Sequence, residues 1–249
     1  MQKQPLSGKI RSLYTCTISE VRTQPMPSTK GRLTVQILQE QAVRFAQQES
    51  HHDERKIFGV DNGKTIGTYF EKKFQKFLAE KFSYVVGSAA KGIDFPELGV
   101  DMKTTSIKQP QSSCPFKDAR QKIFGLGYSV LLFVYEKSDD RTKRTARLNI
   151  LHTIFIEKER TADYQMTTKI RETLENDGNE DDIAALLLDR NLLVDEVEAH
   201  NIAREILEHP PEAGYLTISN AYQWRLQYSR VIDKAGEVEG IKRLGQSDE

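Results

Sequence analysis

Apolar side chains recur at intervals of three and four residues in two stretches near the start of the chain. The clearer stretch runs from Thr65 to Phe82, where the spacing predicts an amphipathic helix with lysines on its outer face. The other stretch, from Leu33 to Gln48, predicts a second helix by the same spacing. Proline, glycine, serine and threonine are scattered through residues 1–30, which predicts an N-terminal arm with little regular structure.

Short apolar runs bounded by turn residues predict strands in the middle of the chain. Residues 84–86, 92–95 and 100–105 indicate three short strands. Residues 129–135 are almost continuously apolar, which is typical of a strand buried on both faces, and residues 146–156 predict a further strand. Strands interleaved with helices favour a mixed sheet that has helices on its faces.

Beyond residue 160 the pattern becomes mainly helical. We therefore expect an α/β protein with a central mixed β-sheet flanked by helices, followed by a mainly helical C-terminal part over residues 158–233. Residues 234–249 are polar, and we expect them to fray. The remaining predicted elements are a polar loop at 106–115, a short helix at 116–124, helices at about 160–175, 180–189 and 195–208, and a strand at 214–219.

A formal net charge of zero conceals an uneven distribution of charge. Twelve acidic residues lie between Glu172 and Glu208 against only Arg190 and Arg204, a net charge of −10, so the rest of the chain carries +10. A basic body is suited to phosphate contacts. The acidic segment could be a helix-turn-helix, but its recognition helix would meet DNA phosphates with like charge. We therefore expect a structural subdomain or a subunit contact there.

Composition excludes several classes of protein. The chain has 249 residues, of which 38% are hydrophobic and 29% charged, as in an ordinary globular protein. No apolar run approaches the roughly 20 residues of a membrane helix, and no secretory signal is recognisable, so we expect a cytoplasmic protein without a membrane partner. Cys16 and Cys114 lie far apart with no cysteine or histidine at ligand spacing, so the sequence suggests neither a disulfide framework nor a zinc site.

The residues best suited to chemistry lie between Gly92 and Thr105. Asp94 and Asp101 fall on two predicted strands, and Lys103 follows two residues after the second aspartate. Because residues two apart on a strand share a face, Asp101 and Lys103 point the same way. A hairpin can bring Asp94 to that face as well. The alternative is an exposed hairpin in which Asp101 and Lys103 form a weak surface ion pair.

Two converging carboxylates resist ionising together unless a cation neutralises them. Mg²⁺ prefers such hard oxygen ligands and usually keeps several bound waters. At a phosphodiester it would polarise a phosphoryl oxygen and activate water, while Lys103 could orient that water or stabilise developing charge. The pattern therefore suits phosphodiester hydrolysis. Lys103, a substrate phosphate and bulk water all stay open as the general base.

Asp94 followed by Asp101-Met-Lys103 resembles the motif of the PD-(D/E)xK nuclease superfamily, and type II restriction endonucleases in particular. The resemblance covers about residues 63–136 and implies a restriction-endonuclease-like core over residues 31–157. Ile93 stands where many members have proline, and the short spacing between the aspartates requires a tight hairpin.

The resemblance also implies roles for residues and partners. Glu71, in the sequence Gly67-Thr-Tyr-Phe-Glu71, resembles the helical glutamate that many members add to the metal site. Asp94, Asp101, Lys103 and Glu71 would then be catalytic, with Mg²⁺ bound by the three acids. The implied partners are double-stranded DNA, a second copy of the chain in a homodimer, and a cognate DNA methyltransferase that acts separately. Residues 158–233 would complete DNA recognition or form the dimer contact.

Polar residues beyond the catalytic strand are candidates for DNA contact, because such side chains can bond phosphates or base edges. The loop and the following helix contribute most of them, and the aromatic and basic segment 220–230 adds one more. Each could instead be solvated surface. The candidates are Thr104, Thr105, Lys108, Gln109, Lys117, Arg120, Gln121 and Arg225.

Three other functions stay open from the sequence. A repair or mismatch nuclease would share the metal site but act on structured or nicked DNA. A noncatalytic DNA-binding protein would share the basic body. A protein-interaction module would use the acidic helices.

Overall fold

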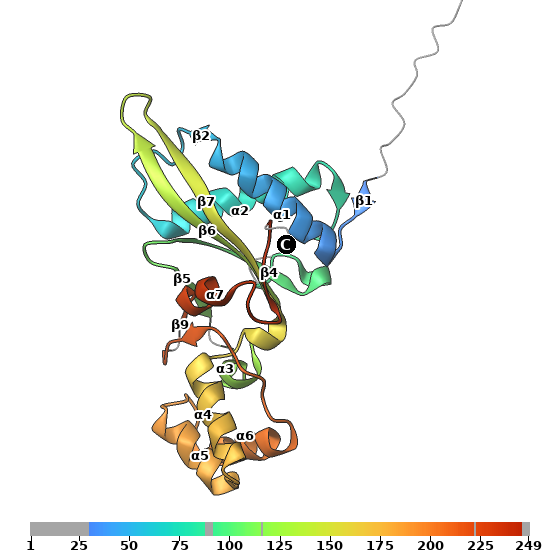
Figure 1. Cartoon of the computed structure of the whole chain (residues 1–249), viewed down its shortest axis with the longest axis vertical. Helices are drawn as coiled ribbons and strands as arrows, with labels where there is room; N and C mark the ends of the chain where they lie inside the picture. Colours follow the sequence, from blue (N-terminus) through green and yellow to red (C-terminus); the bar gives the residue numbers. More distant parts are fainter. Residues whose placement is uncertain (1–29, 88–91, 116, 222, 246–249) are drawn as a thin grey trace, which may run out of the picture.

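The computed structural model describes residues 30–87, 92–115, 117–221 and 223–245. The molecule is elongated, with a sheet and two long helices at one end and a group of helices at the other (Figure 1). This architecture confirms the predicted α/β class, with a mixed sheet flanked by helices and a mainly helical part later in the chain. Apart from Lys30, the predicted N-terminal arm lies outside the described residues.

The central sheet consists of β2 (Asp53–Glu54), β4 (Val100–Ser106), β6 (Ser129–Asp140), β7 (Thr145–Ile156) and β10 (Ile241–Arg243). Its order is β10, β7, β6, β4, with β2 also paired to β7. β4 runs parallel to β6, whereas the other pairs are antiparallel, so the sheet is mixed. β4 ends this order, and one side of the strand is therefore open to other elements.

Helices α1 (Val35–Ser50) and α2 (Gly63–Ala79) cover one face of the sheet. Every fourth residue of α2 from Ile66 to Leu78 is buried, as the apolar spacing predicts. Phe74 of α2 packs against Phe133 of β6, with ring centroids 5.5 Å apart. Beside these helices, β1 (Gly31–Arg32) and β3 (Phe82–Ser83) form a short parallel pair.

The opposite face is covered by one segment from the middle of the chain and by segments near its end. β5 (Gln111–Pro115), β9 (Gln223–Gln227) and β8 (Thr217–Ile218) form a small antiparallel sheet, and α7 (Ser229–Lys234) follows it. Trp224, Leu226 and Tyr228 are buried in one cluster with Val130 and Leu132 of β6. The C-terminal segment thus completes the core.

The helical part comprises α3 (Gln121–Phe124), α4 (Tyr164–Glu175), α5 (Glu180–Asp189) and α6 (Glu196–Glu208), and the short 3-10 helix η2 (Lys158–Arg160) precedes α4. These helices enclose a separate hydrophobic cluster. Acidic residues occupy the first turns of α5 and α6, where they interact favourably with the N-terminal end of each helix dipole. Asp195 caps α6 by accepting from the N–H of Glu198.

Four local predictions were wrong. Residues 84–86 and 92–95 are not strands; the latter form a turn that leads into the 3-10 helix η1 (Pro96–Leu98). The expected loop 106–115 contains β5, which pairs with β9. The expected fraying tail contains β10, which pairs with β7. The partners of β5 and β10 lie far away in sequence, so the local pattern could not reveal them.

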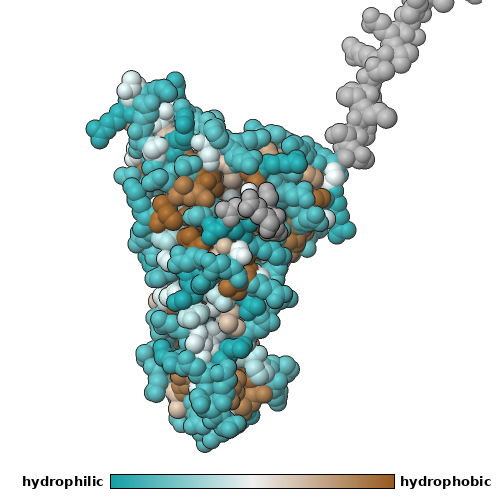
Figure 2. Space-filling view, in the orientation of Figure 1, coloured by the Kyte–Doolittle hydropathy of each residue, from teal (hydrophilic) through white to brown (hydrophobic). Residues whose placement is uncertain are grey.

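The surface of the molecule is mostly hydrophilic in the view of Figure 2, with hydrophobic patches on both the sheet-containing and the helical parts. Leu188, Val197 and Leu207 are large hydrophobic residues exposed on the helical part. None of the described helices has the length and apolar character that a membrane-spanning segment needs.

Candidate active site

The two faces of β4 serve different purposes. Val100 and Met102 point into the cluster that includes α1 and α2. Asp101 and Lys103 alternate with them and point to the other side, as the strand period predicts. Nζ of Lys103 lies 2.5 Å from Oδ2 of Asp101. The two charges form an ion pair at the edge of the sheet.

A tight turn brings Asp94 to the same place. The backbones of Phe95 and Val100 bond to one another across η1, with N···O distances of 2.9 and 3.2 Å. Gly99 closes the turn at a φ of 61°, in the left-handed region that favours glycine. One carboxylate oxygen of Asp94 accepts from the N–H of Met102 at 2.9 Å. Asp94 therefore lies beside Asp101, although it is carried by a turn and not by a strand.

The environment opposes ionisation of both aspartates. Burial raises the pKa of Asp101 to about 6, an effect that Lys103 opposes and Asp94 reinforces. Burial also raises the pKa of Asp94; the Met102 hydrogen bond opposes this rise, and the carboxylate of Glu71 adds to it. The pKa of Asp94 thus responds to both of the other acids.

Lys103 is charged despite its partial burial. Burial lowers the pKa of Lys103, but the Asp101 carboxylate more than offsets this effect, so the pKa lies above its usual value. Tyr228 lies close enough to Lys103 to influence its pKa, and the hydroxyl of this buried residue lies 2.5 Å from the hydroxyl of Ser112. Burial raises the pKa of Tyr228, which stays neutral. Lys103 is therefore the cation that balances Asp101.

The donor set suits a divalent cation only in part. Asp94 and Asp101 provide hard carboxylate oxygens, which are the ligands that Mg²⁺ prefers. Their raised pKa values indicate that the surrounding positive charge does not fully compensate both carboxylates. Within the described ranges, however, no group of three or more His, Cys, Asp or Glu side chains is arranged to hold a metal ion. Glu71 lies close enough to affect Asp94 but does not complete a three-ligand cluster.

A polar cavity of about 730 Å³ opens beside these residues. The N-terminal half of α2 forms one wall, and β4, β5 and β9 form the others. The residues that bear on function here are Glu71 and Lys103, with Thr104, Thr105, Gln109, Gln111, Ser112, Ser113, Gln223 and Arg225.

The predicted DNA contacts separate into two groups. Thr104, Thr105, Gln109 and Arg225 line the cavity. Thr105 is already engaged there, since its hydroxyl accepts from the N–H of Gln111 at 2.9 Å. Ser112 and Ser113 also line the cavity, but sequence reasoning missed them because it read β5 as a loop. The sequence Gln-Ser-Ser-Cys-Pro has one apolar residue only, Cys114, so it shows no strand period of its own.

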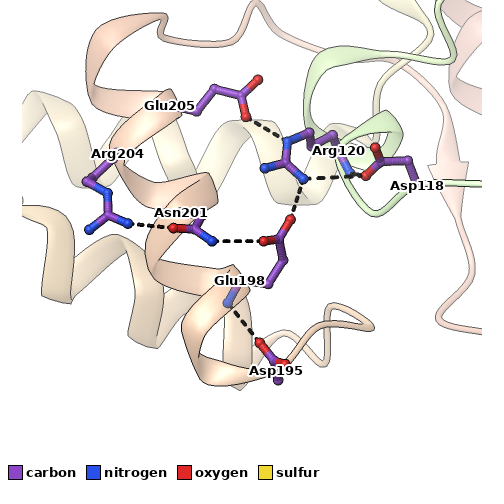
Figure 3. Close-up of polar contacts among 7 residues, drawn as sticks. All are labelled: Asp118, Arg120, Asp195, Glu198, Asn201, Arg204 and Glu205. Carbon is purple, nitrogen blue, oxygen red and sulfur yellow. Dashed lines mark hydrogen bonds and ion pairs between the residues drawn. The ribbon is translucent and has the colours of Figure 1, made fainter.

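The other predicted contacts lie outside the cavity lining. Lys108 and Lys117 are exposed. The side-chain amide of Gln121 donates to the carbonyl of Leu126 at 2.8 Å. Arg120 is turned toward the helical part (Figure 3), where it pairs with Glu198 at 2.5 Å and with Glu205 at 2.7 Å. A phosphate contact by Arg120 would have to displace these carboxylates.

A mixed sheet whose edge strand carries an aspartate and a lysine, with a second aspartate in the preceding turn and a polar cavity beside them, is the architecture of a restriction endonuclease. The family model described as type II restriction enzyme NspV matches residues 32–243, and the chain belongs to this family. It is 60% identical over 209 residues to the type II restriction enzyme NspV of Nostoc sp., covering 84% of this chain and 95% of that protein. No solved structure matches the chain.

Family membership confirms the predicted type II restriction endonuclease. It decides against the repair nuclease, the noncatalytic DNA-binding protein and the interaction module that the sequence left open.

Proposed function

We propose that this endonuclease hydrolyses phosphodiester bonds at a specific sequence in double-stranded DNA, with Asp94, Asp101 and Lys103 as its catalytic residues. The observation that carries the assignment is the ion pair between Asp101 and Lys103 beside Asp94, at a sheet edge that borders a polar cavity. A scissile phosphate in this cavity would lie near the positive charge of Lys103 and the carboxylates of Asp94 and Asp101. All three side chains come from β4 and the turn before it.

Mg²⁺ is the proposed cofactor, bound by Asp94 and Asp101, with Glu71 as a further ligand. The raised pKa values of both aspartates support this assignment, because burial disfavours their negative charge and a bound divalent cation would compensate it. When bound, the ion would polarise a phosphoryl oxygen and lower the pKa of a coordinated water.

Lys103 acts in this proposal as a charge and not as a base. Its raised pKa keeps it protonated at neutral pH, so it cannot accept a proton from water. It can stabilise negative charge that develops on the phosphate in the transition state. The proton of the attacking water then goes to a substrate phosphate or to bulk water.

The candidate DNA contacts remain part of the proposal. Thr104, Gln109 and Arg225 border the cavity directly, whereas Lys108 and Lys117 are exposed nearby in sequence and suit contacts to phosphate. We further infer that two copies act together on the two strands of a symmetric site. A separate cognate methyltransferase would protect the cell's own DNA, and both proteins would act in the cytoplasm.

Digestion of a long DNA of mixed sequence tests the proposal. Wild-type protein with Mg²⁺ is expected to give discrete fragments, whereas EDTA or the variant Asp101→Asn leaves the DNA intact. Lys103→Ala should cut about 100- to 1000-fold more slowly, the usual effect of removing one group that stabilises the transition state.

Asp233→Asn is the matched control, because this aspartate is exposed on α7. It should cut like the wild type. Full activity of Asp101→Asn, or equal cutting in EDTA, would contradict the proposed site, and a smear would contradict sequence specificity.

A further inference from the structure

β5 and β9 form an antiparallel ribbon with one buried and one exposed face. On β9, Trp224 and Leu226 are buried, whereas Gln223, Arg225 and Gln227 are exposed. The buried face packs into the core on the sheet side opposite α1 and α2. The packing of the buried face therefore holds the ribbon in place, and its exposed face is available to a partner.

The outer face carries polar groups and no acid along the register. Gln111 lies opposite Gln227, and Ser113 lies opposite Arg225. The guanidinium of Arg225 forms no hydrogen bond with any residue that the structure describes, and the same holds for the side-chain amides of Gln111, Gln223 and Gln227. Arg120, by contrast, is paired with Glu198 and Glu205. The ribbon thus presents donors and acceptors that are free to meet a ligand.

The position of the ribbon connects it to the chemistry. Arg225, Gln223, Gln111 and Ser113 line the same cavity as Lys103. A two-stranded β-ribbon fits the major groove of B-form DNA, where arginine can bond guanine O6 and N7 and glutamine can bond adenine N6 and N7. A duplex whose phosphate reaches Lys103 would place base edges against this face.

We infer that the β5–β9 ribbon reads the bases of the DNA target, with Arg225, Gln223 and Gln227 as specificity-determining residues. The inference rests on the proposed function, because it assumes that the cavity receives duplex DNA. Arg225 in particular would recognise a guanine. Substitution of Arg225 is therefore expected to change the discrimination at one G·C pair.

Cleavage of short duplexes tests the inference. The site is first mapped with wild-type protein, and single-turnover rates are then measured for the mapped site and for every single-base-pair variant of it. In the wild type each change lowers the rate. Arg225→Ala should lose about 10- to 100-fold of the discrimination at one G·C pair and keep the discrimination at the others, since one bidentate contact supplies about that much.

Three further variants separate base reading from loss of charge or misfolding. Arg225→Lys keeps the positive charge but not the paired geometry, so it should lose the same discrimination. Arg141→Ala removes an exposed arginine at the tip of the β6–β7 hairpin and should leave every ratio unchanged. Gln227→Ala should relax discrimination at a different base pair.

The possible failures can be told apart. If wild-type protein gives no discrete fragments, the proposed function fails and the inference fails with it. If the wild type discriminates but the Arg225 variants lower all rates equally and keep the ratios, the ribbon does not read bases and the proposed function stands.

Discussion

Asp101 is only 3% exposed, and groups around it shift the pKa of its carboxyl group in opposite directions. Burial and Asp94 favour its neutral form, Lys103 favours its charged form, and the balance places the pKa at about 6. Because folding raises this pKa, the group stabilises the fold at low pH, and that contribution is lost as the pH rises through about 6. At neutral pH the charged carboxylate therefore lowers stability. A buried carboxylate that is charged at neutral pH despite this cost is suited to binding a cation.

The pH dependence of cleavage should report this group. At a low Mg²⁺ concentration, we expect the single-turnover rate to fall as the pH is lowered through about 6, because protonation removes a proposed metal ligand. A higher Mg²⁺ concentration should move the midpoint to lower pH, since the metal and the proton compete for the same oxygens. A midpoint that does not respond to Mg²⁺ would argue against Asp101 as a ligand.

At the scale of elements, α2 links the core to the cavity. Phe74 is buried against Phe45, Phe95 and Phe133, while Glu71, one turn earlier on the helix, lines the cavity. Residues three apart on a helix are neighbours, so the packing of Phe74 fixes the position of Glu71. The sequence spacing predicted this helix because its apolar face is continuous.

Phe74→Ala should lower the free energy of unfolding by about 3–5 kcal/mol, because it leaves a cavity among aromatic rings. Urea unfolding followed by circular dichroism measures this change. Lys72→Ala on the exposed side of the same helix is the control and should change the free energy by less than about 0.5 kcal/mol. Equal effects of the two substitutions would mean that α2 does not pack as described.

Local periodicity was informative where a single element determined the outcome. It predicted α2 and the shared face of Asp101 and Lys103, because each depends on the geometry of one helix or one strand. It failed for residues 92–95, which it predicted as a strand, whereas Asp94 lies in a turn that leads into the 3-10 helix at Pro96–Leu98. A backbone bridge across the turn still brings the aspartates together.

Long-range pairing explains the remaining failures. β5 gains its strand character from β9, and its side chains then become part of the cavity wall. Arg120 similarly meets Glu198 and Glu205, which lie 78 and 85 residues later in the chain. A local pattern contains no information about such partners, so the arginine looked like a free phosphate contact.

At the scale of the whole molecule, the acidic and basic halves are separated in space. Most of the acids between residues 172 and 208 belong to α4, α5 and α6, which lie at the end of the molecule remote from α1 and α2 (Figure 1). Several of them are already used within the helical part, as helix caps and as the partners of Arg120. The basic charge is left to the part that contains the cavity, where it can attract DNA.

The salt dependence of DNA binding distinguishes free cations from engaged ones. Each lysine or arginine that contacts a phosphate adds about 1 to the slope of log K against log salt concentration. Lys117 is exposed, and its ammonium group lies near Gly92 in the turn before Asp94, so Lys117→Ala should reduce the slope by about 1.

Arg120→Ala should leave that slope unchanged, because Glu198 and Glu205 already neutralise the guanidinium. It should instead speed amide hydrogen exchange in α6, which loses its tie to the segment before α3. Binding titrations at several salt concentrations, together with exchange measurements on the free protein, separate the two roles. A slope reduced by about 1 in Arg120→Ala, with exchange in α6 unaltered, would mean that Arg120 leaves its carboxylates to contact phosphate.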